Sequence, residues 1–107
     1  MAVEPARVNE LIDKAIAFLG EHIRVSAVFL FGSHLTGDAD EWSDIDIAVF
    51  SPEIEDMRLM ARVRLATDLR LSQGLELEPH FFPEWALHDP PEGSFAEHVI
   101  KTGKRIV

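Results

Sequence analysis

The sequence contains no cysteine and no tyrosine, and it has few basic residues for its acidic content. Without cysteine, the 107-residue chain has neither disulfides nor thiolate metal ligands. No apolar run approaches the roughly 20 residues that a membrane-spanning helix needs. Residues 1–9 also lack the apolar block of a signal peptide. We therefore expect a cytoplasmic protein that makes no contact with a membrane.

Basic charge is scarce, because 19 aspartates and glutamates face 10 lysines and arginines, for a net charge of −9. The negative electrostatic field of such a protein repels phosphate backbones, so we expect no direct binding to nucleic acid. The charge suits a basic protein partner, and it is equally consistent with solubility alone. Hydrophobic residues make up 47 % of the chain, which is typical of a folded protein. The length predicts a single domain over residues 1–107.

In the first half of the chain, a helix precedes two strands. Apolar residues at helical spacing predict an amphipathic helix over 5–20, which ends at Gly20. A run of β-branched and aromatic residues predicts a buried strand over 23–31. A short helix or turn follows over 33–35. The alternation over 44–50 predicts a second strand, with its isoleucines and valine on one face.

The second half continues the alternation of helices and strands. Ser51 and the following proline predict the start of a helix over 52–73. A third strand over 75–78 ends before the next proline. A proline-rich loop over 83–93 leads to a capping box that opens a last helix over 94–102. The predicted fold is α/β (α+β), a small mixed β-sheet with helices packed on it.

Two short motifs lie close together in this pattern. Gly32 and Ser33 follow the first strand, and ten residues later comes Asp44-Ile45-Asp46. Glycine permits a sharp turn and the close approach of a phosphate, and the serine hydroxyl adds a hydrogen bond. Both aspartates project from one strand face, where they repel each other unless a cation lies between them. Mg²⁺ suits such a site, because it binds one or two carboxylates together with substrate phosphate.

Two further carboxylates on the predicted third strand are candidates to complete the site. Glu76 and Glu78 share one face there, and we favour Glu78 because it comes last, where the chain leaves the sheet. An Asp-x-Asp pair alone is typical of a solvated strand face, but the Gly-Ser pair and the downstream glutamates favour a site. A P-loop is excluded, because Asp38-Ala39 stands where Lys and Ser or Thr are required.

Three aromatic side chains are secondary candidates. His34 and His80 lie near the predicted pocket and are candidates for contact with a nucleotide, although no histidine has metal-ligand spacing. Trp42 precedes the Asp pair, so it is placed to stack on a base, or to pack in the core or the loop. For all three, an ordinary surface or packing role remains the main alternative.

The stretch over 23–82, with its Gly-Ser pair and its Ser-Asp-Ile-Asp motif, resembles the nucleotidyltransferase superfamily that includes DNA polymerase beta. The chain looks like a minimal nucleotidyltransferase (MNT) domain, and domains of this kind are typically antitoxins. The resemblance implies a polymerase beta palm-like fold. It also implies transfer of a nucleoside monophosphate, AMP from ATP, to an acceptor hydroxyl with release of pyrophosphate.

The same resemblance implies roles for particular residues. Asp44 and Asp46 would bind two Mg²⁺ ions, and Glu78 would bind the catalytic ion and help to activate the acceptor. Gly32 and Ser33 would hold the triphosphate. Glutamate replaces the aspartate that the family most often has as its third acid.

Larger members of the superfamily carry an extra domain that binds the acceptor, and we expect no room for such a domain in a chain of this length. By the resemblance, the acceptor is presented by a partner, a HEPN-domain RNase toxin that receives AMP, usually on tyrosine. The chain has no tyrosine and therefore does not modify itself there. Two alternatives stay open: a non-catalytic module that neutralises a toxin by covering it, and an enzyme that acts alone on a small acceptor.

Overall fold

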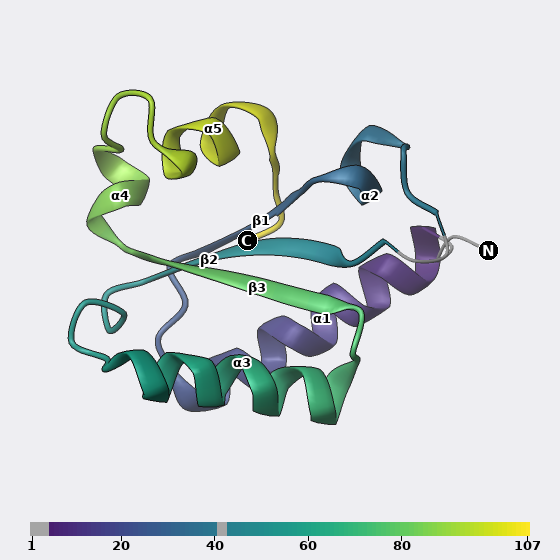
Figure 1. Ribbon diagram of the computed structural model, residues 1–107, viewed down its shortest axis with the longest axis horizontal. Helices are drawn as coiled ribbons and strands as arrows, with labels where there is room; N and C mark the ends of the chain where they lie inside the picture. Colours follow the sequence, from purple (N-terminus) through teal and green to yellow (C-terminus); the bar gives the residue numbers. More distant parts are fainter. Residues whose placement is uncertain (1–4, 41–42) are drawn as a thin grey trace.

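The computed structural model describes residues 5–40 and 43–107. Its centre is a mixed sheet in the order β3-β2-β1-β4 (Figure 1). The strands are β1 (Ala27–Phe31), β2 (Ile45–Ser51), β3 (Leu77–Pro83) and β4 (Lys104–Arg105). Strand β1 runs antiparallel to β2 and β4, whereas β2 and β3 are parallel. The predicted mixed sheet with helices packed on it is therefore confirmed.

Helices cover both faces of the sheet. Figure 1 shows α1 (Pro5–His22) and α3 (Leu59–Gln73) on one side, and α4 (Trp85–His88) and α5 (Phe95–Thr102) on the other. The one-turn helix α2 (Ser33–Thr36) follows β1 directly. Among the helices of residues 5–40 and 43–107, none has the length and apolar character of a transmembrane span.

The central strand β2 has a different environment on each face. Ile45, Ile47 and Val49 are fully buried in the core beneath α1 and α3, as the alternation predicts. Ala48 and Phe50 are also fully buried, but in a second core beneath α4 and α5. Because side chains alternate along a strand, the even-numbered positions of β2 all face α4 and α5.

The predicted strand over 23–31 is too long at its start, because β1 begins at Ala27. Helix α1 instead continues two residues past Gly20. The Ile23 N–H donates to the Leu19 carbonyl at 2.8 Å, so helical bonding extends to this residue. Ile23 is 7 % exposed and packs in the core beneath α1 and α3, so its apolar character reflects the helix end.

The predicted start of the helix over 52–73 is wrong, because α3 begins seven residues later. The Ser51 hydroxyl accepts the N–H of Glu53 at 3.1 Å and closes a local turn there. This turn buries Ile54 to 3 % exposure. Arg58 then has an extended backbone, with φ −67° and ψ 153°, and separates the turn from α3.

The strand predicted over 75–78 does not end at Pro79, because β3 continues to Pro83. The Ile45 N–H donates to the Glu76 carbonyl at 2.6 Å, which fixes the register with β2. In a parallel pair, this register turns the backbone groups of even-numbered β3 residues toward β2. Both prolines are odd-numbered and face the open edge, where a missing N–H breaks no ladder bond.

The last helix begins as the capping box predicts. The Ser94 hydroxyl accepts the N–H of Glu97 at 3.1 Å, and the Glu97 carboxylate accepts the N–H of Gly93 at 3.1 Å. Ser94→Ala should therefore lower the free energy of unfolding by about 1 kcal/mol, as measured by urea denaturation. Ser72→Ala is the control, because Ser72 is exposed inside α3. Equal losses in both variants would refute a role for the cap.

Candidate functional site

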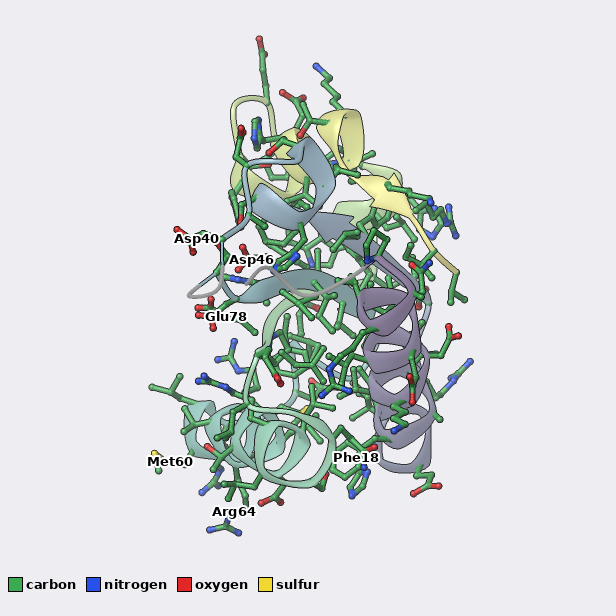
Figure 2. The ribbon with its side chains drawn as sticks, turned by 90° about the vertical axis from the view of Figure 1, so that its right-hand side faces the viewer. Phe18, Asp40, Asp46, Met60, Arg64 and Glu78 are labelled. Atoms are coloured by element: carbon green, nitrogen blue, oxygen red, sulfur yellow. The ribbon has the colours of Figure 1, made fainter. Side chains whose placement is uncertain are left out.

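The acidic residues come together at one end of the sheet. Asp46 pairs with Phe31 of β1 on one side and with Glu78 of β3 on the other. Paired residues project to the same face, so these side chains form a row across three strands. Figure 2 shows Asp40, Asp46 and Glu78 projecting from the same side of the molecule. The structure thus places Glu78 directly opposite Asp46.

A histidine joins this pair. Asp46, Glu78 and His80 each offer one ligand atom, and these atoms all lie within 4.8 Å of one another. We call them the three-donor cluster. The His80 Nε2–H donates to Asp46 Oδ1 at 3.3 Å. Two carboxylate oxygens and one imidazole nitrogen are the donor types that bind divalent metal ions in proteins.

The surroundings of the three-donor cluster also fit a cation. Asp46 and Glu78 are like charges directly opposite each other, which destabilises the strand pair unless a positive charge lies nearby. The side chains of Asp46 and His80 are 24 % and 31 % exposed. They are buried enough to be held in place, and open enough for an ion to reach them from solvent.

The Gly-Ser turn touches this cluster. Gly32 has φ +79°, and a Cβ added to it would lie 2.5 Å from Asp46 Oδ2. The backbone conformation favours glycine here, and a side chain would fit only if the Asp46 carboxylate moved. The Gly32 carbonyl accepts the N–H groups of Leu35 at 3.0 Å and Thr36 at 3.2 Å, so α2 begins at once with Ser33. The turn therefore lies directly against the Asp46 carboxylate.

Two of the candidate acids lie outside the cluster. Asp44 precedes β2 and is exposed, and its carboxylate is not among the three donors. Its role as a metal ligand stays a prediction. Glu76 precedes β3, and its carboxylate lies 3.9 Å from the guanidinium of Arg7. Of the two glutamates, it is Glu78 that faces Asp46.

Of the other secondary candidates, His34 lies in α2. The His34 Nε2–H donates to the Ser43 carbonyl at 3.1 Å, which ties α2 to the start of β2. Trp42 lies outside the described residues. A cavity of about 430 Å³ beside α2 includes Ser33 and His34 in its lining, but the three-donor cluster does not line it. A nucleotide site at the cluster would therefore lie outside this cavity.

His80 was predicted to lie near the pocket as a candidate for nucleotide contact, but not as a member of the acidic cluster. The predicted strand ended before Pro79, which put His80 in a loop and hid its alternation with Glu76 and Glu78. Once the strand continues through the proline, Glu78 and His80, two residues apart, project to one face. The period of two was thus present in the sequence, but the proline concealed it.

The mixed sheet, the acidic cluster and the Gly-Ser turn can now be compared with known proteins. Residues 13–107 match the family model described as polymerase beta, nucleotidyltransferase. The chain belongs to this nucleotidyltransferase family, as its motifs suggest. No curated protein matches the sequence.

Two solved structures resemble the fold. One is a protein from Sulfolobus solfataricus described as a candidate nucleotidyltransferase, with 20 % identity, a TM-score of 0.61, and coverage of 78 % of this chain and 73 % of that one. The other is a toxin–antitoxin complex with AMP-PNP, with 28 % identity and a TM-score of 0.61. The match covers 87 % of this chain and 69 % of that one. The first likeness supports the fold alone.

Proposed function

We propose that the protein transfers AMP from ATP to a hydroxyl group of a partner protein, and that it acts as the antitoxin of a toxin–antitoxin pair with a HEPN-domain toxin. The observation that carries this proposal is the opposed pair Asp46 and Glu78 beside Gly32. The family match supports nucleotide transfer. The neighbour described as a toxin–antitoxin complex with AMP-PNP supports both a toxin partner and an adenine nucleotide.

In this proposal the carboxylates bind the metal ions, and the Gly-Ser turn binds the nucleotide. Asp46 and Glu78, joined by Asp44, would bind two Mg²⁺ ions, which neutralise charge on the attacking and leaving oxygens. Gly32 and Ser33 leave space for the triphosphate. The acceptor oxygen bonds to the α-phosphorus, and the bond from this phosphorus to pyrophosphate breaks. The Glu78 carboxylate takes up the proton of the acceptor hydroxyl.

The exposed apolar surface supports a protein as acceptor. Leu59, Met60 and Leu71 of α3 are 66 %, 67 % and 72 % exposed. Large apolar side chains that gather on one helix are typical of a protein interface. Figure 2 shows Met60 on the same side of the molecule as Asp46 and Glu78. A partner that covers this side would bring its own hydroxyl toward the acids.

The test uses the full chain with the protein encoded by the neighbouring gene. With Mg²⁺ and ATP labelled on the α-phosphate, we expect label on the partner and a mass increase of one adenylyl group. Label on the γ-phosphate should not transfer, because it leaves with pyrophosphate. Transfer of the γ-label, or an unchanged partner mass, would contradict the proposal. Pyrophosphate release without any partner would instead favour a small acceptor.

A second candidate is neutralisation by binding alone. It is favoured by the position of Asp44 outside the three-donor cluster, which leaves two carboxylates close together rather than three. The two functions differ in reversibility. A toxin inhibited only by coverage regains its activity after the proteins are separated, whereas an AMP-modified toxin stays inactive. Recovery of full toxin activity after incubation with ATP would support binding alone.

A further inference from the structure

We propose that His80 is a direct ligand of the metal ion at Asp46 and Glu78, and that this nitrogen donor makes the site favour a transition-metal ion such as Mn²⁺ over Mg²⁺. The inference rests on the metal site of the proposed function. It goes beyond that function, because the resemblance supplies only carboxylates and Mg²⁺ at this position.

The sheet register gives the His80 side chain room to lean toward the acids. His80 pairs with Ala48 of β2, which is fully buried and has only a methyl side chain. Asp46 lies two residues before Ala48 on the same face, at a diagonal distance that long side chains can span. The imidazole therefore reaches over Ala48, and its Nε2 lies 3.3 Å from Asp46 Oδ1.

Aromatic neighbours hold the ring in this orientation. The centroid of the Phe31 ring lies 5.1 Å from that of His80, with an angle of 62° between the planes. The Phe95 ring lies 6.0 Å away at 65°. Phe31 comes from β1 and Phe95 from α5, so two separate elements fix the imidazole. A ligand whose orientation is fixed loses little freedom when it binds a metal ion.

The observed hydrogen bond can give way to metal coordination. At 3.3 Å, the contact between His80 Nε2 and Asp46 is longer than the roughly 2.7–2.9 Å of a strong charged hydrogen bond. In the neutral imidazole, the proton occupies either ring nitrogen. With the proton on Nδ1, the Nε2 lone pair faces the position between the carboxylates. This change of tautomer alters no net charge.

The donor set then determines which ions bind well. Mg²⁺ requires a nearly ideal octahedron of oxygen ligands, whereas Mn²⁺, which also suits oxygen ligands, belongs to the first-row transition series whose ions bind mixed nitrogen and oxygen sites. One nitrogen beside two carboxylates therefore raises the affinity for Mn²⁺ relative to Mg²⁺. Replacement of His80 by aspartate would restore an all-oxygen set and should shift the preference back toward Mg²⁺.

The test is pulsed electron paramagnetic resonance of Mn²⁺ bound to the full chain with AMP-PNP, on protein without a histidine tag. We expect nuclear coupling from a nitrogen. The coupling should change its pattern when only histidine carries the heavy nitrogen isotope, which distinguishes the protein from the adenine. His80→Asn should abolish this coupling and lower the ratio of Mn²⁺ to Mg²⁺ affinity by about tenfold or more. His98→Asn is the control, because His98 stacks on Phe95 outside the cluster.

The outcomes separate this inference from the function on which it rests. Bound Mn²⁺ without histidine coupling would mean that His80 only orients Asp46, which overturns the inference and leaves the metal site intact. Failure of Mn²⁺ to bind at all would overturn both the inference and the metal dependence of the proposed transfer. The labelled wild-type protein gives its answer even if a His80 variant fails to fold.

Discussion

Asp46→Asn should lower the rate of AMP transfer by at least about 100-fold, because even residues that only support a metal ligand cost 10–100-fold when they are lost. The substitution removes the negative charge of the Asp46 carboxylate and alters little else in the side chain. Asparagine has the same shape, and its oxygen can still accept the hydrogen bond that His80 donates at 3.3 Å. It also leaves the Gly32 turn in place. A loss of activity would therefore report the missing negative charge at the cation site.

The measurement is transfer of label from the α-phosphate of ATP to the partner protein, with circular dichroism to verify that the variant is folded. Asp40→Asn is the matched control. Asp40 is exposed on the same side of the molecule, and its carboxylate accepts a hydrogen bond from the Ser43 hydroxyl at 3.1 Å. We expect this variant to keep its activity. Comparable losses in both variants would point to general charge rather than to metal binding.

The same assay on Asp44→Asn decides the role of the first aspartate of the pair. Its exposed carboxylate lies outside the three-donor cluster. A loss as large as that of Asp46→Asn would mean that Asp44 joins the site when the nucleotide and metal bind. Unchanged transfer would mean that the cluster of Asp46, Glu78 and His80 is sufficient.

Local periodicity accounts for what the sequence could predict. The buried face of β2 follows from alternation that is visible within a few residues, and the fully buried Ile45, Ile47 and Val49 confirm it. The capping box before α5 is likewise a contact between near neighbours, Ser94 and Glu97. Such features need no knowledge of the rest of the fold, which is why they could be predicted.

Several of the errors depend on packing or pairing with distant segments. Whether Pro79 ends a strand depends on which edge its nitrogen faces, and only the register with β2 decides this. For the same reason, His80 was not predicted to share a strand face with Glu78. Strand β4, at residues 104–105, is too short for a pattern, and it forms because the chain end pairs with β1. The Ser51 turn replaced a helix start because it buries Ile54.

Gly32→Ala should impair both folding and transfer. Its φ of +79° is unfavourable for any residue with a side chain and costs about 1–3 kcal/mol. The new methyl would also lie 2.5 Å from Asp46 Oδ2, so the carboxylate must move away from the cation site. We expect transfer to fall about as far as in Asp46→Asn. Thermal unfolding measures the stability loss, and the α-phosphate assay measures transfer.

Gly37→Ala separates backbone strain from this clash. Gly37 also has a positive φ, +86°, at the end of α2, but nothing lies within 4 Å of a Cβ added there. The Gly37→Ala variant should therefore lose stability through backbone strain but keep the wild-type transfer rate. Gly32→Ala should lose both, because only there does the added atom displace Asp46. If the Gly32 variant transfers AMP at the wild-type rate, the turn can yield without moving the carboxylate. Close contact between the Gly-Ser turn and the acid would then be unnecessary for the reaction.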